Sequence, residues 1–158
     1  MLRADVWCHR RPSMRAYGLR LGLCAVAVAI VGASIVPALA DPRGVWLAKD
    51  GAKVRVSKCG ANMCGTLIST NPARDPATKR PFIDAKNPDP KLAKRPLVGI
   101  VVFQTMRPNG PGKWSGRLYD TDRGITVDGH LIEKSKKVLR VEGCVGAMCG
   151  GEDMTRVR

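Results

Sequence analysis

Four of the six cysteines occur in two matching phrases. The sequence reads Cys-Gly-Ala-Asn-Met-Cys-Gly at 59–65 and Cys-Val-Gly-Ala-Met-Cys-Gly at 144–150, so each phrase holds two cysteines with four residues between them. Two thiols at this spacing can form a disulfide, bind a metal as thiolates, or act as a redox pair. Glycine and asparagine are residues of hairpin turns, and a four-residue turn would place the two cysteines opposite each other on antiparallel strands.

We therefore predict two local disulfides, Cys59–Cys64 and Cys144–Cys149. Each would close a ring of about six residues, for which chain entropy gives roughly 2 kcal/mol of stabilisation. A zinc site with four thiolates is one alternative, although the spacing is longer than the knuckle of structural zinc sites. A redox-active pair is another, although its usual spacing is Cys-x-x-Cys. We expect no metal and no cofactor.

The remaining polar residues form no recognisable catalytic set. His130 is the only histidine after residue 40, and its place beside Asp128 and Gly129 predicts an exposed residue in a hairpin turn. Asp120 and Asp122 suggest a calcium-binding loop, but an EF-hand needs glycine at its sixth position and glutamate at its twelfth. Counted from Asp120, the glycine is fifth (Gly124) and the twelfth residue is Leu131. The sequence also holds no Gly-x-Ser-x-Gly nucleophile elbow. We therefore predict that the protein is not an enzyme, with an unrecognised hydrolase as the alternative.

The chain is strongly basic, with a formal charge of +14. Such a charge attracts anionic partners, and aromatic residues make up only 4% of the chain, which argues against a nucleic-acid reader that stacks bases. Expected partners are therefore an anionic lipid, lipopolysaccharide or another polyanion, or a small amphipathic ligand, but not nucleic acid. A solvated basic surface that only favours solubility is the alternative. The residues expected to contact acidic groups lie in one stretch: Arg74, Lys79, Arg80, Lys94 and Arg95.

The first forty residues predict export. Five arginines precede a charge-free run at 21–40, which ends in Ala38-Leu39-Ala40. A basic start, an apolar middle and an Ala-x-Ala end are typical of a secretory signal peptide, so we predict that residues 1–40 are cleaved after Ala40 and that the protein is periplasmic or secreted. Cleavage would remove five arginines and one aspartate and lower the formal charge from +14 to +10. An uncleaved 21–40 segment that anchors the protein in the inner membrane is the alternative.

Residues 41–158 predict one all-β domain. The residues at 71–96 include six of the chain's eleven prolines, which predicts a long loop rather than a helix or central strand. About eight short strands in up-and-down order favour a small antiparallel barrel, because closure removes exposed strand edges, and a sandwich is the alternative. The expected strands are 44–47, 53–59, 65–70, 97–105, 114–119, 125–127, 129–133, 138–143 and 151–157.

Several motifs resemble the bacterial domain-of-unknown-function 2147 family. They are Gly-Val-Trp at 44–46, the cysteine phrase at 58–65, Asn-Pro-Asp-Pro at 87–90, Arg-Pro-Leu-Val-Gly-Ile at 95–100, Trp-Ser-Gly-Arg-Leu-Tyr-Asp at 114–120 and the second cysteine phrase at 143–151. The resemblance covers nearly all of 41–158 and implies an exported protein with a lipocalin-like barrel and no established activity. Met154 departs from it, because the family usually shows tryptophan there.

The lipocalin-like pattern also implies a structural role for two residues. Trp46 in the first strand would plug one end of the barrel, and Arg156 in the last strand would lie across the indole ring. A cation over an aromatic face stabilises a protein by about 0.5–2 kcal/mol, depending on how far it is desolvated.

These observations predict an exported, non-enzymatic small barrel that binds an envelope component or an amphipathic or anionic small molecule. The barrel mouth and the 71–96 loop would form the site. The alternative is a structural or stress-related envelope protein, because a barrel of eight strands is often just wide enough to pack its own side chains. An apolar cavity under the loop would favour binding, and a solid interior would favour the structural role.

Overall fold

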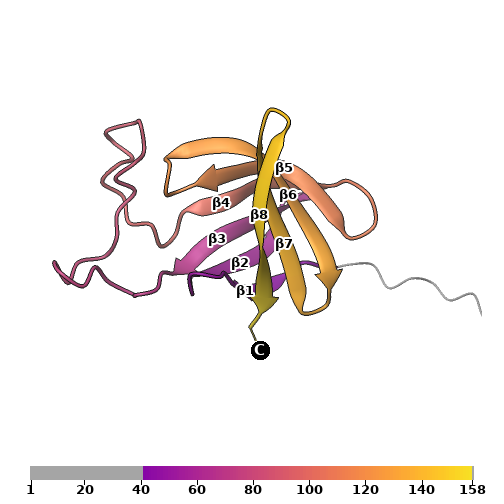
Figure 1. The fold of residues 1–158 in the computed structure, drawn as a ribbon, viewed down its shortest axis with the longest axis horizontal. Coiled ribbons are helices and arrows are strands. Elements are labelled where there is room, and N and C mark those ends of the chain that lie inside the picture. Colours follow the sequence, from indigo (N-terminus) through magenta and orange to yellow (C-terminus); the bar gives the residue numbers. More distant parts are fainter. Residues whose placement is uncertain (1–40, 158) are drawn as a thin grey trace, which may run out of the picture. The chain divides into compact units, whose positions relative to one another are not determined.

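The computed structural model describes residues 41–157. The predicted signal peptide, 1–40, lies outside the described residues. Eight strands form a closed antiparallel barrel in which each strand pairs with the next and the last pairs with the first (Figure 1). The predicted all-β, up-and-down barrel is therefore confirmed. The strands are β1 (Gly44–Leu47), β2 (Lys53–Cys59), β3 (Asn62–Ser69), β4 (Val101–Pro108), β5 (Lys113–Asp120), β6 (Ile125–Ser135), β7 (Val138–Val145) and β8 (Met148–Arg156).

The alternation of apolar and polar residues explains the barrel core. In β2, Val54 and Val56 are buried while Arg55 and Ser57 are exposed, as expected when alternate side chains point to opposite faces of a strand. Leu139 and Val141 in β7 repeat the pattern. Within 41–157 no helix is long and apolar enough to cross a membrane.

The barrel has two different ends. One end carries the β1–β2 turn, the 71–96 loop, the β5–β6 turn and the β7–β8 turn, and we call it the loop end. The other, the closed end, is filled by Trp46, which is fully buried and donates its indole N–H to the Pro42 carbonyl at 2.7 Å. The Arg156 guanidinium lies 4.2 Å from the Trp46 ring centroid and donates to the carbonyl oxygen of Lys136 at 2.6 Å. The structure thus contains the expected plug.

Two strands begin earlier than predicted because the turns between the cysteines are shorter than expected. β3 begins at Asn62 rather than 65, and β8 begins at Met148 rather than 151. Each turn has two residues, and its first residue, Gly60 or Gly146, has a positive φ. A glycine with positive φ at that position is typical of a tight type II′ hairpin.

β6 is one strand where the sequence predicted two. Gly129 continues the strand, because it pairs with Gly116 on one side and Gly143 on the other. The prediction that His130 is an exposed turn residue is therefore wrong. His130 lies within β6, half-buried, with its Nδ1 atom 3.0 Å from the Ser115 hydroxyl of β5.

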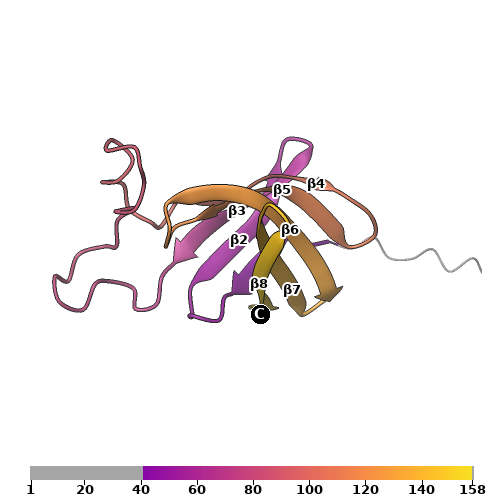
Figure 2. The same cartoon turned by 45° about the horizontal axis from the view of Figure 1, so that its top comes forward.

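The 71–96 loop folds back on itself and extends to one side of the barrel (Figures 1 and 2). Ile83 and Pro96 form an isolated antiparallel bridge, and the backbone N–H of Leu97 donates to the Phe82 carbonyl at 2.9 Å. The loop also packs on the β5–β6 turn, where Gly124 has a φ of 69° and a Cβ atom would overlap the Lys86 backbone. Residues 97–100 form a turn in which the backbone N–H of Ile100 donates to the Leu97 carbonyl at 3.1 Å, so β4 begins only at Val101, not at residue 97.

Candidate functional site

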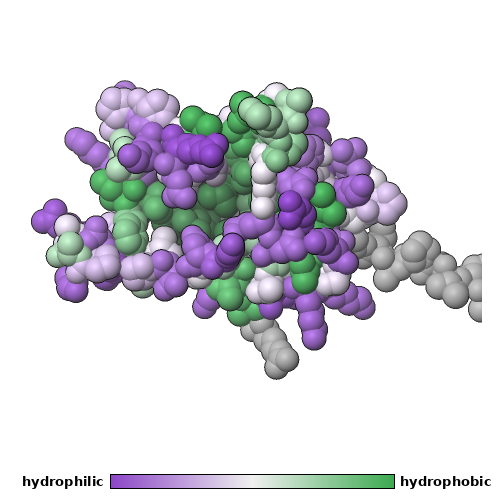
Figure 3. Space-filling model, viewed as in Figure 1, coloured by the Kyte–Doolittle hydropathy of each residue, from purple (hydrophilic) through white to green (hydrophobic). Residues whose placement is uncertain are grey.

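A cavity of about 390 Å³ opens at the loop end of the barrel. Phe82 of the loop and Leu97, the first residue after it, line the edge of the cavity, which we call the lip. Figure 3 shows the hollow as an apolar region bordered by hydrophilic side chains. Small-molecule sites commonly measure about 300–1,000 Å³, so the cavity has the size of a binding site. Its apolar walls come from the strands: Val54, Leu67, Val102, Phe103, Leu118, Val141 and Met154.

A glycine of β8 leaves part of this space open. Gly116, Gly129, Gly143 and Gly150 are cross-strand partners in a row that runs from β5 to β8. Gly150 lines the cavity, and a Cβ atom there would meet no atom within 4 Å. At the other three positions a Cβ atom would meet existing atoms within 3 Å, so the barrel interior is open only beside Gly150 of β8 along this row.

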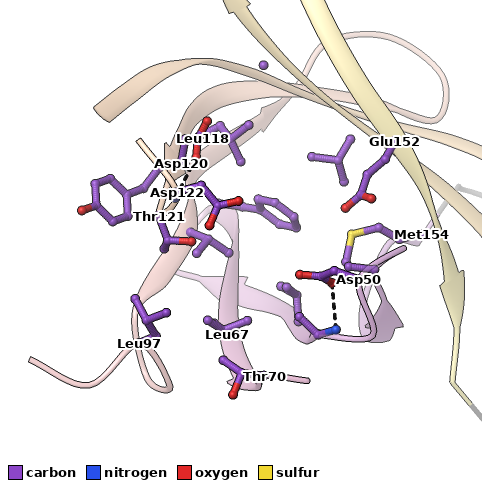
Figure 4. A pocket seen from close by; sticks show the side chains of 18 of the residues that line it. Asp50, Leu67, Thr70, Leu97, Leu118, Asp120, Thr121, Asp122, Glu152 and Met154 are labelled. Atoms are coloured by element: carbon purple, nitrogen blue, oxygen red, sulfur yellow. Dashed lines mark hydrogen bonds between the residues drawn. The ribbon is translucent and has the colours of Figure 1, made fainter. Parts of the chain in front are cut away.

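The cavity mouth carries four carboxylates, which we call the acidic rim: Asp50, Asp120, Asp122 and Glu152 (Figure 4). Three of them accept a backbone N–H. Asp50 accepts from Ala52 at 2.9 Å, Asp120 from its neighbour Asp122 at 2.9 Å, and Glu152 from Lys49 at 3.2 Å. These bonds fix the carboxylates at the mouth. No lysine, arginine or histidine of the described chain lines the cavity.

A buried aspartate ties the lip to the barrel. Asp84 is 0% exposed and accepts hydrogen bonds from the Tyr119 hydroxyl at 2.7 Å, the Asn87 amide at 2.9 Å and the Arg95 Nε at 3.0 Å. The Arg95 guanidinium also forms an ion pair with Asp84 at 2.9 Å and lies 5.6 Å from the Tyr119 ring centroid. We call these four residues the Asp84 cluster.

The cluster perturbs two ionisable groups. Burial alone would raise the pKa of Asp84, but hydrogen bonds from Tyr119, Asn87 and Arg95 and the charge of Arg95 outweigh it, so the pKa lies below its ordinary value. Burial raises the pKa of Tyr119, and the hydrogen bond to the Asp84 carboxylate raises it further. Asp84 is therefore ionised and Tyr119 protonated at neutral pH. Through these contacts the cluster holds the loop against β5.

None of the five basic residues predicted to contact acidic groups lines the cavity. Arg95 is bound to Asp84, and Arg80 lines a separate recess within the loop. Arg74 donates to the Lys79 carbonyl at 3.3 Å. Lys79 and Lys94 are exposed. Their predicted contact with acidic groups therefore concerns the loop surface rather than the cavity.

The structure contains both predicted disulfides, with Cα–Cα distances of 5.7 Å for Cys59–Cys64 and 4.1 Å for Cys144–Cys149. Cys144 and Cys149 are direct cross-strand partners, whereas Cys59 pairs with Asn62, so the first bridge runs diagonally. The four sulfur atoms are thus bonded in pairs, not gathered as zinc ligands. In 41–157 no three histidine, cysteine or acidic residues lie close enough to hold a metal.

Sequence reasoning did not identify the Asp84 cluster or the acidic rim. The signals were present: Asp120 and Asp122 stood out as closely spaced acids, and Asn87 lies in the Asn-Pro-Asp-Pro motif. Only the fold shows that Asp50 and Glu152, which are far apart in the sequence, lie with Asp120 and Asp122 at the mouth of one cavity.

Comparison with known proteins agrees with this architecture. No curated protein matches the chain. A solved structure described as protein HP1028 from the human pathogen Helicobacter pylori, which belongs to the lipocalin family, is similar with a TM-score of 0.64. It is 19% identical, and the match covers 75% of this chain and 84% of that one, so it shows the lipocalin-like fold alone. Residues 44–156 match the family described as "Uncharacterized protein conserved in bacteria (DUF2147)", and the chain belongs to that family.

Proposed function

We propose that the protein binds a small amphipathic molecule in the cavity at the loop end, and that its role is binding rather than catalysis. The cavity itself carries the proposal: it has the volume of a ligand site, its walls are apolar, and its polar groups lie at the mouth. An apolar ligand segment would enter between the strands and leave its polar group at the rim. The filled-barrel alternative requires a solid interior, and the cavity argues against it.

The lip supports the same proposal. Phe82 and Leu97 line the cavity, and the Asp84 cluster fixes the loop between them. A preformed lip costs less conformational entropy on binding than a loop that must first become ordered. The loop is therefore built as a wall of the site.

We also propose that binding occurs outside the cytoplasm, in the periplasm or after secretion. The leader-like pattern at 1–40 supports this location, and two disulfides favour an oxidising compartment.

Filling the cavity tests the proposal. Gly150 shares a strand face with Glu152 and Met154, so Gly150→Phe would project a ring into the cavity. Met154→Trp would add volume from the same strand, in case the first variant folds poorly. Thr155→Phe, on the exposed face of β8, is the matched control. The probe is the neutral dye N-phenyl-1-naphthylamine, whose fluorescence rises in apolar sites.

We expect saturable dye binding to the wild type and the Thr155 variant, and at least about tenfold weaker binding to either filled variant, which is about 1.4 kcal/mol. Dye binding that is absent from the wild type, or unchanged when both fillers fold with native melting curves, would contradict the proposal.

A second candidate is contact of the 71–96 loop with an anionic membrane surface. Arg74, Lys79, Arg80 and Lys94 are exposed, and Ile83 adds an exposed apolar side chain at 48%. Basic residues beside exposed apolar ones suit an interfacial contact. Retention of the protein on vesicles of anionic lipid should then fall as the salt concentration is raised. Retention that does not change with salt concentration would rule out an electrostatic contact.

A further inference from the structure

We infer that the ligand of this cavity is cationic: an apolar chain or ring joined to a protonated amine. The inference rests on the proposed function, because it assigns a chemical class to the molecule that would occupy the same cavity. The sequence analysis expected an amphipathic or an anionic molecule, and the inference keeps the amphipathic class but replaces the anionic group, which was expected from the overall charge of the chain, with a cationic one.

The acidic rim surrounds the mouth from two sides. Asp50 comes from the β1–β2 turn and Glu152 from β8, and Glu152 accepts the backbone N–H of Lys49, the residue before Asp50. Asp120 and Asp122 stand on the other side, at the end of β5 and in the turn that follows it. A charged group at the mouth would therefore have carboxylates on both sides of it.

Few cations offset these carboxylates. Asp120 forms the rim's one ion pair among the described residues, at 3.6 Å from Arg123, whose side chain is 69% exposed. Asp50, Asp122 and Glu152 take part in none of the ion pairs found within 41–157. The charged side chains that line the mouth are thus all acidic, in a chain whose formal charge is +14.

Charge complementarity then decides between ligand classes. A fatty acid that inserted its chain would bring its own carboxylate among four others, and such a like-charge contact opposes binding. A metal ion is not favoured, because the four carboxylates are spread around the mouth and no three acidic residues of the described chain gather as ligands. A protonated amine needs no such convergence, since it can donate to any one carboxylate while the others contribute their field.

Three probes with the same ten-carbon chain test the inference. Decylammonium, decanoate and decanol, each below its micellar concentration, compete with N-phenyl-1-naphthylamine for the purified protein at pH 7. We expect decylammonium to displace the dye at a concentration at least about tenfold below that of decanoate. The concentration of decanol that displaces the dye should lie between those of the two charged probes. The preference should shrink as salt is raised, because the rim is open to solvent.

A matched pair of triple variants locates the effect. The rim variant combines Asp50→Asn, Asp122→Asn and Glu152→Gln, which keeps side-chain size while removing three charges. The control variant combines Asp41→Asn, Asp128→Asn and Asp153→Asn, three exposed acids that do not line the cavity. The preference for decylammonium should disappear in the rim variant and persist in the control.

The two proposals fail in different ways. If decanoate displaces the dye as well as decylammonium does, or if the preference survives in the rim variant, the cationic assignment is wrong while the binding site stands. If none of the three probes displaces a dye that the filled variants have placed in the cavity, the assignment is again wrong. If the dye does not occupy the cavity at all, both proposals fall.

Discussion

Replacing Asp84 with asparagine should destabilise the protein by about 3 kcal/mol, because it removes the charge on which the Asp84 cluster is organised. Asp84 is 0% exposed, and three side chains donate hydrogen bonds to its carboxylate. Asparagine keeps the shape but turns one oxygen into a donor, which would face groups that are themselves donors. Removing one partner of a buried ion pair costs about 3–5 kcal/mol.

The lower end of this range applies because the Arg95 side chain is 36% exposed, so water can hydrate the guanidinium once its partner is lost. For a domain of this size, about 3 kcal/mol corresponds to a fall in Tm of roughly 10 °C. Tyr119→Phe removes one donor and should cost about 1 kcal/mol. The double variant should lose less stability than the two single variants lose together, because both single variants lose the same 2.7 Å hydrogen bond.

The sign of the pH dependence follows from the pKa of Asp84. Because the folded state lowers this pKa, the carboxylate stabilises the folded protein at pH values above the ordinary aspartate pKa of about 4. This contribution is lost as pH falls from about 4 through the lowered folded-state pKa. The wild type should therefore lose stability in this acidic window more steeply than Asp84→Asn, and the two free energies of unfolding should converge at low pH.

Urea unfolding with intact disulfides, followed by tryptophan fluorescence from pH 2 to pH 8, would measure these free energies. Asp89→Asn is the control, because Asp89 lies in the same loop but is exposed. A loss at neutral pH no larger than that of Asp89→Asn would refute the reasoning. So would a difference between wild type and Asp84→Asn that stays constant across the acidic window.

Two further predictions concern the closed end and the disulfides. Changing Cys144 and Cys149 together to serine should cost about 2 kcal/mol in urea unfolding, because the bridge closes a ring of about six residues; no loss would show that the bridge does not constrain the unfolded chain. Arg156→Met should cost at least the cation–π contribution of about 0.5–2 kcal/mol, yet leave dye binding unchanged; a large loss of affinity in the folded variant would show that the closed end communicates with the cavity.

Features of the barrel that depend on local sequence could be predicted. Alternating valines predicted β2, and the glycines between cysteines predicted tight turns, although the turns have two residues rather than four. Proline density predicted the 71–96 loop, because proline removes a backbone donor wherever it stands. The error at β6 had the same local origin: Asp128-Gly129 resembles a turn, but cross-strand pairing with Gly116 and Gly143 keeps the glycine within a strand.

The site could not be predicted in the same way, because it depends on which segments meet. Asp84 and Tyr119 are 35 positions apart, and neither residue type alone indicates a buried hydrogen bond. Net charge was misleading at the mouth for a related reason. It sums over the whole chain, whereas the field at a cavity depends on the few charges that the fold places there, and these are acids.

The Asp84 cluster also explains how a long loop without regular strands can serve as a wall. The loop has one isolated bridge, between Ile83 and Pro96, so a strand ladder cannot fix its shape. Asp84 and Arg95 flank that bridge, and their two arms are joined by the backbone N–H of Asp84, which donates to the Arg95 carbonyl at 2.9 Å, and by the ion pair of their side chains. The Tyr119 hydroxyl links Asp84 to β5. Phe82 and Leu97 lie just outside the bridge on the same two arms, where one backbone hydrogen bond joins them. The position of the apolar lip therefore depends on a buried charge that takes no part in lining the cavity.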